Sequence, residues 1–152
     1  MNNFQKNIFV SHYHSDAEKI EDMKALLKNK NFYVRDSSIY EEKSKNSAHN
    51  EDYIKSLIRP QIDWAGTVVV LVGKNTADSD WVNWEIENAA SDGKRIVGVY
   101  LQGETDSKIP DALNEHGDAL VKWNSDSIID AINGNDEWNG PDRNWITTRV
   151  TC

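Results

Sequence analysis

The feature that most constrains the fold is the segment TVVVLV at positions 67–72, which contains only residues that favour β-strands. Its apolar residues from Val68 to Val72 follow one another without a polar side chain, so neither face of the strand is suited to water. Strands of this kind lie in the middle of parallel sheets that helices cover on both sides. The segment, which ends at Gly73, therefore predicts an α/β protein built on a central parallel strand.

Strand-like and helical patterns alternate along the rest of the chain. Strands are predicted at 8–10, 32–34, 67–72, 96–100 and 119–121, and helices at 16–31, 51–64, from Ser79 to Gly93 and at 125–133. This alternation indicates βαβ units with right-handed crossovers. Such units favour a flavodoxin-like open parallel five-stranded sheet of order 2-1-3-4-5 with helices on both faces. Ligands of such sheets bind beyond the carboxyl ends of the strands, at the switch point between strands 1 and 3.

Local signals place the ends and the irregularities of these elements. Ser15 or Asp16 is the expected cap of the first helix, and Pro60 predicts a kink or a break near Arg59 in the second. Residues 37–50 are polar and have no sustained period, which predicts a long exposed loop.

The length of 152 residues fits one domain. We place an α/β domain at 1–133 and a C-terminal extension at 134–152. The extension is expected to pack on the same domain through Trp138 and Trp145, because exposed indole rings are unfavourable in a monomer.

The charge of the chain disfavours several classes of partner. Twenty-five acidic and 17 basic residues give a net charge of −8, which argues against nucleic acid and against anionic membranes. The one cysteine, Cys152, cannot form an internal disulfide. The longest apolar run is far shorter than the roughly 20 residues of a membrane helix, and we expect a cytoplasmic location.

A polar run, HYHSD at 12–16, follows the first predicted strand. Two His and an Asp at this spacing resemble the start of the zinc site of metallo-β-lactamases. The next His of that pattern is replaced by Ala17, and only His49 and His116 remain as further imidazole ligands. Because imidazoles in a polar loop are more often solvated than bound to metal, we expect no metal site. The chain also has no GxGxxG, P-loop or GxSxG motif.

The predicted helix after Ser79 carries the sequence SDWVNWEIENA. Val82, Ile86 and Ala89 share the face that packs on the sheet. Trp81 and Glu85 are i and i+4 on an adjacent face, so the indole and the carboxylate meet beside the expected crevice. Taken alone, Glu85 would be a solvated surface carboxylate and Trp81 a partly buried packing residue.

Three segments together resemble Toll/interleukin-1-receptor (TIR) domains. IFVSH at 8–12 is similar to their first strand and FYVRD at 32–36 to their second, while VVLVGKNTA at 69–77 with SDWVNWEI at 79–86 is similar to the TIR-like proteins of the Thoeris anti-phage defence system. The likeness extends from about residue 6 to residue 133. The chain departs from many TIR domains at Val82, where they have Cys, and at His12, where Tyr is usual.

This resemblance implies a NAD⁺ glycohydrolase or cyclase in which Glu85 is the catalytic carboxylate. It implies that Trp81 lines the pocket, and that Ser11, His12 and Asp36, at the ends of the first two strands, contact the substrate. NAD⁺ is then a substrate, and no cofactor is expected. In this family the product is usually a cyclic ADP-ribose-type nucleotide that activates a separate effector protein, and TIR domains often self-associate when active.

Two other functions fit the same fold. Many TIR domains are non-catalytic adaptors that act by self-association, and a nucleoside deoxyribosyltransferase-like enzyme would share a carboxylate-based glycosyl chemistry. A NAD⁺ enzyme of net charge −8 also needs local cations near the pyrophosphate. Arg35, Lys43 and Lys45 are available for this role.

Overall fold

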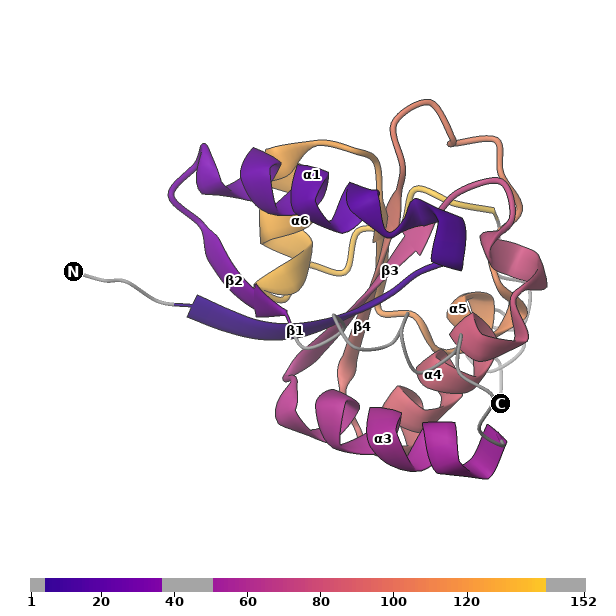
Figure 1. The fold of residues 1–152 in the computed structure, drawn as a ribbon. Helices are drawn as coiled ribbons and strands as arrows, with labels where there is room; N and C mark the ends of the chain where they lie inside the picture. The colour runs from indigo at the N-terminus through magenta and orange to yellow at the C-terminus, as the bar shows by residue number, and fades with distance from the viewer. Residues whose placement is uncertain (1–4, 37–50, 142–152) are drawn as a thin grey trace, which may run out of the picture.

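A five-stranded parallel sheet forms the centre of the molecule, which we describe from a computed structural model for residues 5–36 and 51–141 (Figure 1). Its strands are β1 (Gln5–Ser11), β2 (Tyr33–Asp36), β3 (Thr67–Val72), β4 (Arg95–Tyr100) and β5 (Ala119–Val121). The strand order is β2-β1-β3-β4-β5, with every neighbouring pair parallel. The predicted flavodoxin-like order is therefore confirmed.

Helices cover both faces of the sheet (Figure 1). On one face lie α1 (Glu18–Lys28) and α6 (Ser125–Ile132); on the other lie α3 (Glu51–Trp64), α4 (Asp80–Ser91) and α5 (Asp111–His116). The short helix α5 was not predicted. Within the described residues, no helix is long and apolar enough to cross a membrane.

The central strand β3 has the double burial that its sequence predicts. Val68, Val70 and Val72 pack in the core under α3, α4 and α5, because alternate side chains of a strand point to the same face. Val69 and Leu71 pack in the opposite core under α1 and α6. All five side chains are fully buried, and each contributes about 1.5–3 kcal/mol to folding relative to exposure.

The start of α1 differs from its prediction. Its cap position is Ala17, without a side-chain hydrogen bond, and Ser15 and Asp16 lie in a preceding 3₁₀ turn, His14–Asp16. The Asp16 amide donates to the carbonyl of Tyr13 at 2.8 Å, so the backbone of the turn closes on itself. The predicted cap is therefore wrong, and the Asp16 side chain is directed elsewhere.

Of the kink or break predicted near Arg59, the break is wrong, because α3 continues through Pro60. A proline in a helix removes one N–H donor and frees the carbonyl four residues earlier, here that of Ser56. Both residues are exposed, so water can satisfy the freed carbonyl and the helix persists.

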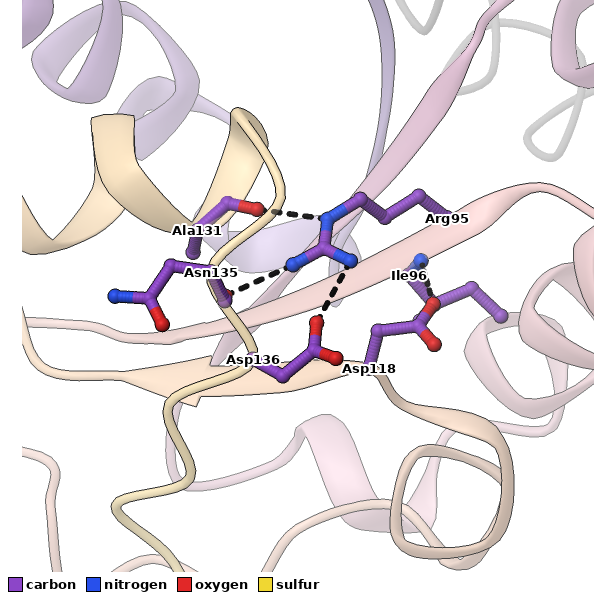
Figure 2. Close-up of polar contacts among 6 residues, drawn as sticks. All are labelled: Arg95, Ile96, Asp118, Ala131, Asn135 and Asp136. Atoms are coloured by element: carbon purple, nitrogen blue, oxygen red, sulfur yellow. Dashed lines mark hydrogen bonds and ion pairs between the residues drawn. The ribbon is translucent and has the colours of Figure 1, made fainter.

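A half-buried arginine joins the end of α6 to the sheet (Figure 2). From the first residue of β4, the Arg95 side chain donates to the carbonyl oxygens of Ala131 at 2.7 Å and Asn135 at 2.8 Å, and pairs with the Asp136 carboxylate at 2.9 Å. Next to it the Ile96 amide donates to Asp118 at 2.9 Å. These contacts fix the direction in which the chain leaves α6.

The chain after α6 lies beside the edge strand β5. The Leu120 amide donates to the carbonyl of Glu137 at 2.9 Å, and the Asn139 amide donates to the carbonyl of Leu120 at 2.7 Å. Trp138 is half-buried against the core on the α5 side. Trp145, the other predicted anchor, lies outside the described residues, as does the predicted loop at 37–50.

Candidate active site

The first turn of α4 is fixed by side-chain hydrogen bonds. Ser79, where the sequence predicts the start of this helix, caps it, and its hydroxyl accepts from the Val82 amide at 3.2 Å. The Asn83 amide group donates to the carbonyl of Ser79 at 3.1 Å, while its oxygen accepts from the backbone amide of Ala112 at 2.9 Å. Asn83, which sequence reasoning missed, thus joins the start of α4 to the start of α5.

A buried threonine side chain stabilises the turn between β3 and α4. The hydroxyl of Thr76, a fully buried residue, accepts from the Gly73 amide at 2.8 Å and donates to the Leu71 carbonyl at 3.2 Å. These two hydrogen bonds hold the turn that follows β3. Helix α4 therefore begins near the carboxyl end of that strand.

Glu85 lies on the packing face of α4. It shares this buried stripe with Val82, Ile86 and Ala89, and its side chain is fully buried. The Ser11 hydroxyl, at the end of β1, donates to the Oε1 atom of Glu85 at 2.7 Å. Glu85 is therefore not the solvated surface carboxylate that it would be if taken alone, and it lies on the packing face itself rather than on the adjacent one.

A buried carboxylate at this position is costly for the fold. Removing an ionised carboxylate from water costs several kcal/mol even after the protein relaxes, whereas a hydrogen bond to a charged group returns only about 1.5–3 kcal/mol. An apolar side chain on the same stripe would avoid the cost. Carboxylates kept in such places are candidates for a chemical role.

The end of β1 places two further candidate residues on opposite faces. Ser11 follows the alternation of Phe9 and points toward α4. His12 is almost fully buried, and its Nδ1–H donates to the carbonyl of Val10 at 3.1 Å. The backbone thus fixes the orientation of the imidazole.

Asp36 does not lie beside Ser11 and Glu85 in the structure. In the sheet Asp36 is level with Ile8, three residues before Ser11. At about 3.3 Å per residue, this separation is about 10 Å along the strand. Arg35 is also distant, since its guanidinium lies 5.3 Å from the ring centre of Trp64 at the far end of α3. Lys43 and Lys45 lie outside the described residues.

Two tryptophans and two cations lie where α3 packs against α4. The rings of Trp81 and Trp84 meet edge to face, with centroids 6.0 Å apart. The Lys55 ammonium and the Arg59 guanidinium of α3 lie 5.2 and 5.5 Å from the ring centre of Trp84. Such cation–π contacts hold the charges at the helix surface. Their i, i+4 spacing is visible in the sequence, but their contact with Trp84 depends on the packing of two helices.

Comparisons with known proteins decide the family. Residues 9–106, more than half of the chain, match the family model described as Thoeris protein ThsB, TIR-like domain. The chain belongs to this family. The resemblance seen in the sequence is therefore confirmed. No curated protein sequence matches the chain.

Comparison with solved structures finds the fold of this TIR-like domain in another protein. A 2-deoxyribosyltransferase from Bacillus psychrosaccharolyticus is similar with a TM-score of 0.52 and 14% identity, over 75% of this chain and 84% of that chain. At this identity the likeness shows a common fold alone. A conserved protein from Enterococcus faecalis V583 has 15% identity over 90% of this chain and 80% of that chain, with a lower TM-score of 0.46.

The TIR-like domain also has an open cavity of about 550 Å³ at the carboxyl edge of the sheet, on the α1 side. The described residues that line it do not include Ser11 or Glu85. We place the candidate active site at Glu85 rather than in this cavity, because a buried carboxylate with an aligned hydroxyl donor is the more specific chemical arrangement. In 5–36 and 51–141, no three His, Cys, Asp or Glu side chains gather as a metal site.

Proposed function

We propose that this TIR-like domain cleaves the nicotinamide–ribose bond of NAD⁺ and makes a cyclic ADP-ribose-type nucleotide that activates a separate effector in anti-phage defence. The observation that carries the proposal is the buried Glu85 carboxylate with the Ser11 hydroxyl 2.7 Å away, in a member of the ThsB TIR-like family. No cofactor takes part, since NAD⁺ is the substrate.

One carboxylate suffices for this chemistry. The bond between the ribose C1′ and the pyridinium nitrogen breaks, and its electron pair leaves with nicotinamide, which becomes neutral and needs no proton. The ribose becomes an oxocarbenium-like cation, and Glu85 stabilises it by charge and by accepting hydrogen bonds from the ribose hydroxyls. A nucleophilic group of the same ADP-ribose, or a water, then forms the new bond to C1′, and a hydroxyl or water that does so loses its proton.

Ser11 and Trp81 support this step in the proposal. By donating to Oε1, Ser11 fixes the direction of the Glu85 carboxylate. Trp81 is one turn before Glu85 on α4 and is half-buried, and in the proposal its ring contacts the ribose or the pyridine. His12, oriented by its backbone contact, is a further candidate for substrate contact.

The cations that offset the pyrophosphate differ from those that the sequence suggested. Lys55 and Arg59 lie against Trp84, which follows Trp81 by one helical turn. We assign the neutralising role to this pair instead of Arg35, which lies on Trp64.

The burial of Glu85 bears on activation. A fully buried carboxylate meets a dinucleotide only after the residues around it move. We therefore expect slow turnover by the isolated chain and faster turnover when the domains self-associate, as TIR domains do.

Nicotinamide release from NAD⁺ tests the proposal, with purified protein and with lysate from phage-infected cells that express it. Glu85→Gln should reduce release by at least about 10²–10³-fold, the usual effect of removing an electrostatic stabiliser. Glu87→Gln is the matched control, because Glu87 lies on the same helix with an exposed side chain. Mass spectrometry of the same reactions identifies the product.

Each alternative has its own outcome in this assay. Release that is equal in the wild type and in Glu85→Gln overturns the catalytic role of Glu85. No release in either preparation supports a non-catalytic adaptor. Base exchange between deoxynucleosides, without use of NAD⁺, supports a deoxyribosyltransferase-like enzyme.

A further inference from the structure

The cavity of about 550 Å³ lies where open α/β sheets bind ligands. β1 and β3 are neighbours in the middle of the sheet, and the chain leaves them toward opposite ends of the strand order, which makes this pair the switch point. Asp16 from the segment after β1, Gly73 after β3 and Leu101 after β4 line the cavity. Its volume is within the range of about 300–1,000 Å³ that is usual for small-molecule sites.

Three carboxylates line this cavity; that of Asp22 pairs with the Lys19 ammonium at 3.9 Å, and the other two are those of Asp16 and Glu104. Asp16 is half-buried, and burial raises the pKa of its carboxyl; the charge of Glu104 raises it further, whereas His12 and Lys19 lower it. The Ser107 hydroxyl donates to Glu104 at 2.9 Å and holds this carboxylate. Neighbouring carboxylates that are partly removed from water are good acceptors for ligand hydroxyl groups.

The backbone leaves room for these groups. A Cβ atom on Gly73 would lie 3.2 Å from the Asp16 carboxylate and 3.0 Å from the Leu101 side chain. Glycine at this position therefore lets the turn after β3 come close to Asp16 without a side chain between them.

The remaining lining is an aromatic and apolar wall with two cations. Trp123 and Leu26 are half-buried against the core on the α1 side, and each presents part of its side chain to the cavity. Lys19 and Lys74 add two ammonium groups, both on exposed residues. An aromatic face, hydroxyl acceptors and cations together match the three parts of a nucleotide: base, ribose and phosphate.

We propose that this cavity is a second ligand site, separate from Glu85, that binds a ribonucleoside monophosphate. Ser11 points toward α4, whereas Asp16 lies on the α1 side, so one short segment of chain borders both sites. A ligand in the cavity that contacts both Asp16 and the turn at Gly73 touches the two segments that lead to Ser11 and to α4. The site therefore has a direct structural route for influencing the position of Glu85.

The test is calorimetric titration of the Glu85→Gln chain with adenosine 5′-monophosphate, because this background has no expected turnover and binding is read by itself. Saturable binding is expected, and inorganic phosphate or adenosine alone should bind at least about tenfold more weakly. The 2′-deoxy form of the nucleotide should also lose affinity, since it lacks one of the hydroxyls that the carboxylates accept from.

Matched variants locate the binding. Trp123→Leu should weaken it about tenfold or more, the usual effect of losing one base-stacking contact, whereas Trp81→Leu, beside Glu85, should not. Lys74→Met should weaken binding severalfold, while Lys28→Met, an exposed lysine of α1 outside the cavity, should not. Lys74 is exposed, so this variant tests the site even if Trp123→Leu does not fold.

Three outcomes overturn the proposal: no saturable binding at millimolar nucleotide, equally tight binding of inorganic phosphate, or loss of binding in Trp81→Leu but not in the Trp123 and Lys74 variants. The last outcome would assign the nucleotide to the Glu85 site. None of these results depends on nicotinamide release, so the second site and the proposed enzymatic activity can be refuted separately.

Discussion

Replacing Ser11 by alanine tests whether the Ser11–Glu85 hydrogen bond holds the candidate active site together. The hydroxyl donates to Oε1 at 2.7 Å, and both side chains are fully buried. Because the site is fully buried, water does not readily replace the lost donor. The substitution removes only the hydroxyl group and no carbon atom. The loss of stability therefore reports this hydrogen bond and little else.

The expected size follows from the charge of the acceptor. A hydrogen bond to a charged group contributes about 1.5–3 kcal/mol, against about 0.5–1.5 kcal/mol for a neutral pair. With a urea m-value of about 2 kcal/mol/M, a loss of about 2 kcal/mol lowers the unfolding midpoint by about 1 M. In a chain of this length the same loss lowers Tm by about 4–8 °C.

Urea unfolding followed by circular dichroism measures the effect. Ser107→Ala is the matched control, because the Ser107 hydroxyl also donates to a carboxylate, that of Glu104 at 2.9 Å, but in a half-buried surface turn. Its free energy of unfolding should change by no more than about 0.5 kcal/mol.

The Glu85→Gln background gives the decisive comparison. There the Ser11 hydroxyl donates to a neutral amide oxygen, so Ser11→Ala should cost about 1 kcal/mol less than in the wild type. Equal costs in the two backgrounds, or a cost in the wild type as small as that of Ser107→Ala, would refute the reasoning.

Three further predictions concern other parts of the structure. Burial raises the pKa of Asp16 above its ordinary value of 3.8, so its ionised form destabilises the fold: the cost is full above the raised pKa and disappears as pH falls below the unfolded value. Asp16→Asn should therefore stabilise the chain more at pH 7 than at pH 4 in urea unfolding; equal changes would contradict this. Gly98→Ala places a Cβ atom 2.8 Å from two leucine side chains and should cost about 1–3 kcal/mol, whereas Gly66→Ala, with nothing within 4 Å, should change stability by less than about 0.5 kcal/mol. Arg95→Met removes two hydrogen bonds and an ion pair and should cost about 1–3 kcal/mol, more than Lys94→Met, which removes one exposed hydrogen bond; thermal unfolding that ranks them the other way would show that the arginine contacts contribute little.

Much of the architecture could be predicted from local pattern. The bounds of β3 and β5 and the start of α4 beside Ser79 agree with the predictions, because they depend on side-chain alternation and on residues close in the sequence. The cap of α1 and the break at Pro60 could not be predicted correctly. The start of α1 depends on a 3₁₀ turn that precedes the helix, and the continuity of α3 depends on the exposure of Pro60.

The sequence by itself determined the doubly wound sheet and its order, since the burial of strands on both faces and the handedness of crossovers leave few arrangements. It also indicated Glu85 through the motif around it. Only the tertiary structure decided that Glu85 points inward to Ser11, 74 positions away along the chain, and that Asp36 does not reach them. The rotation of a helix about its axis and the register between strands are set by contacts between distant segments, and no local pattern contains them.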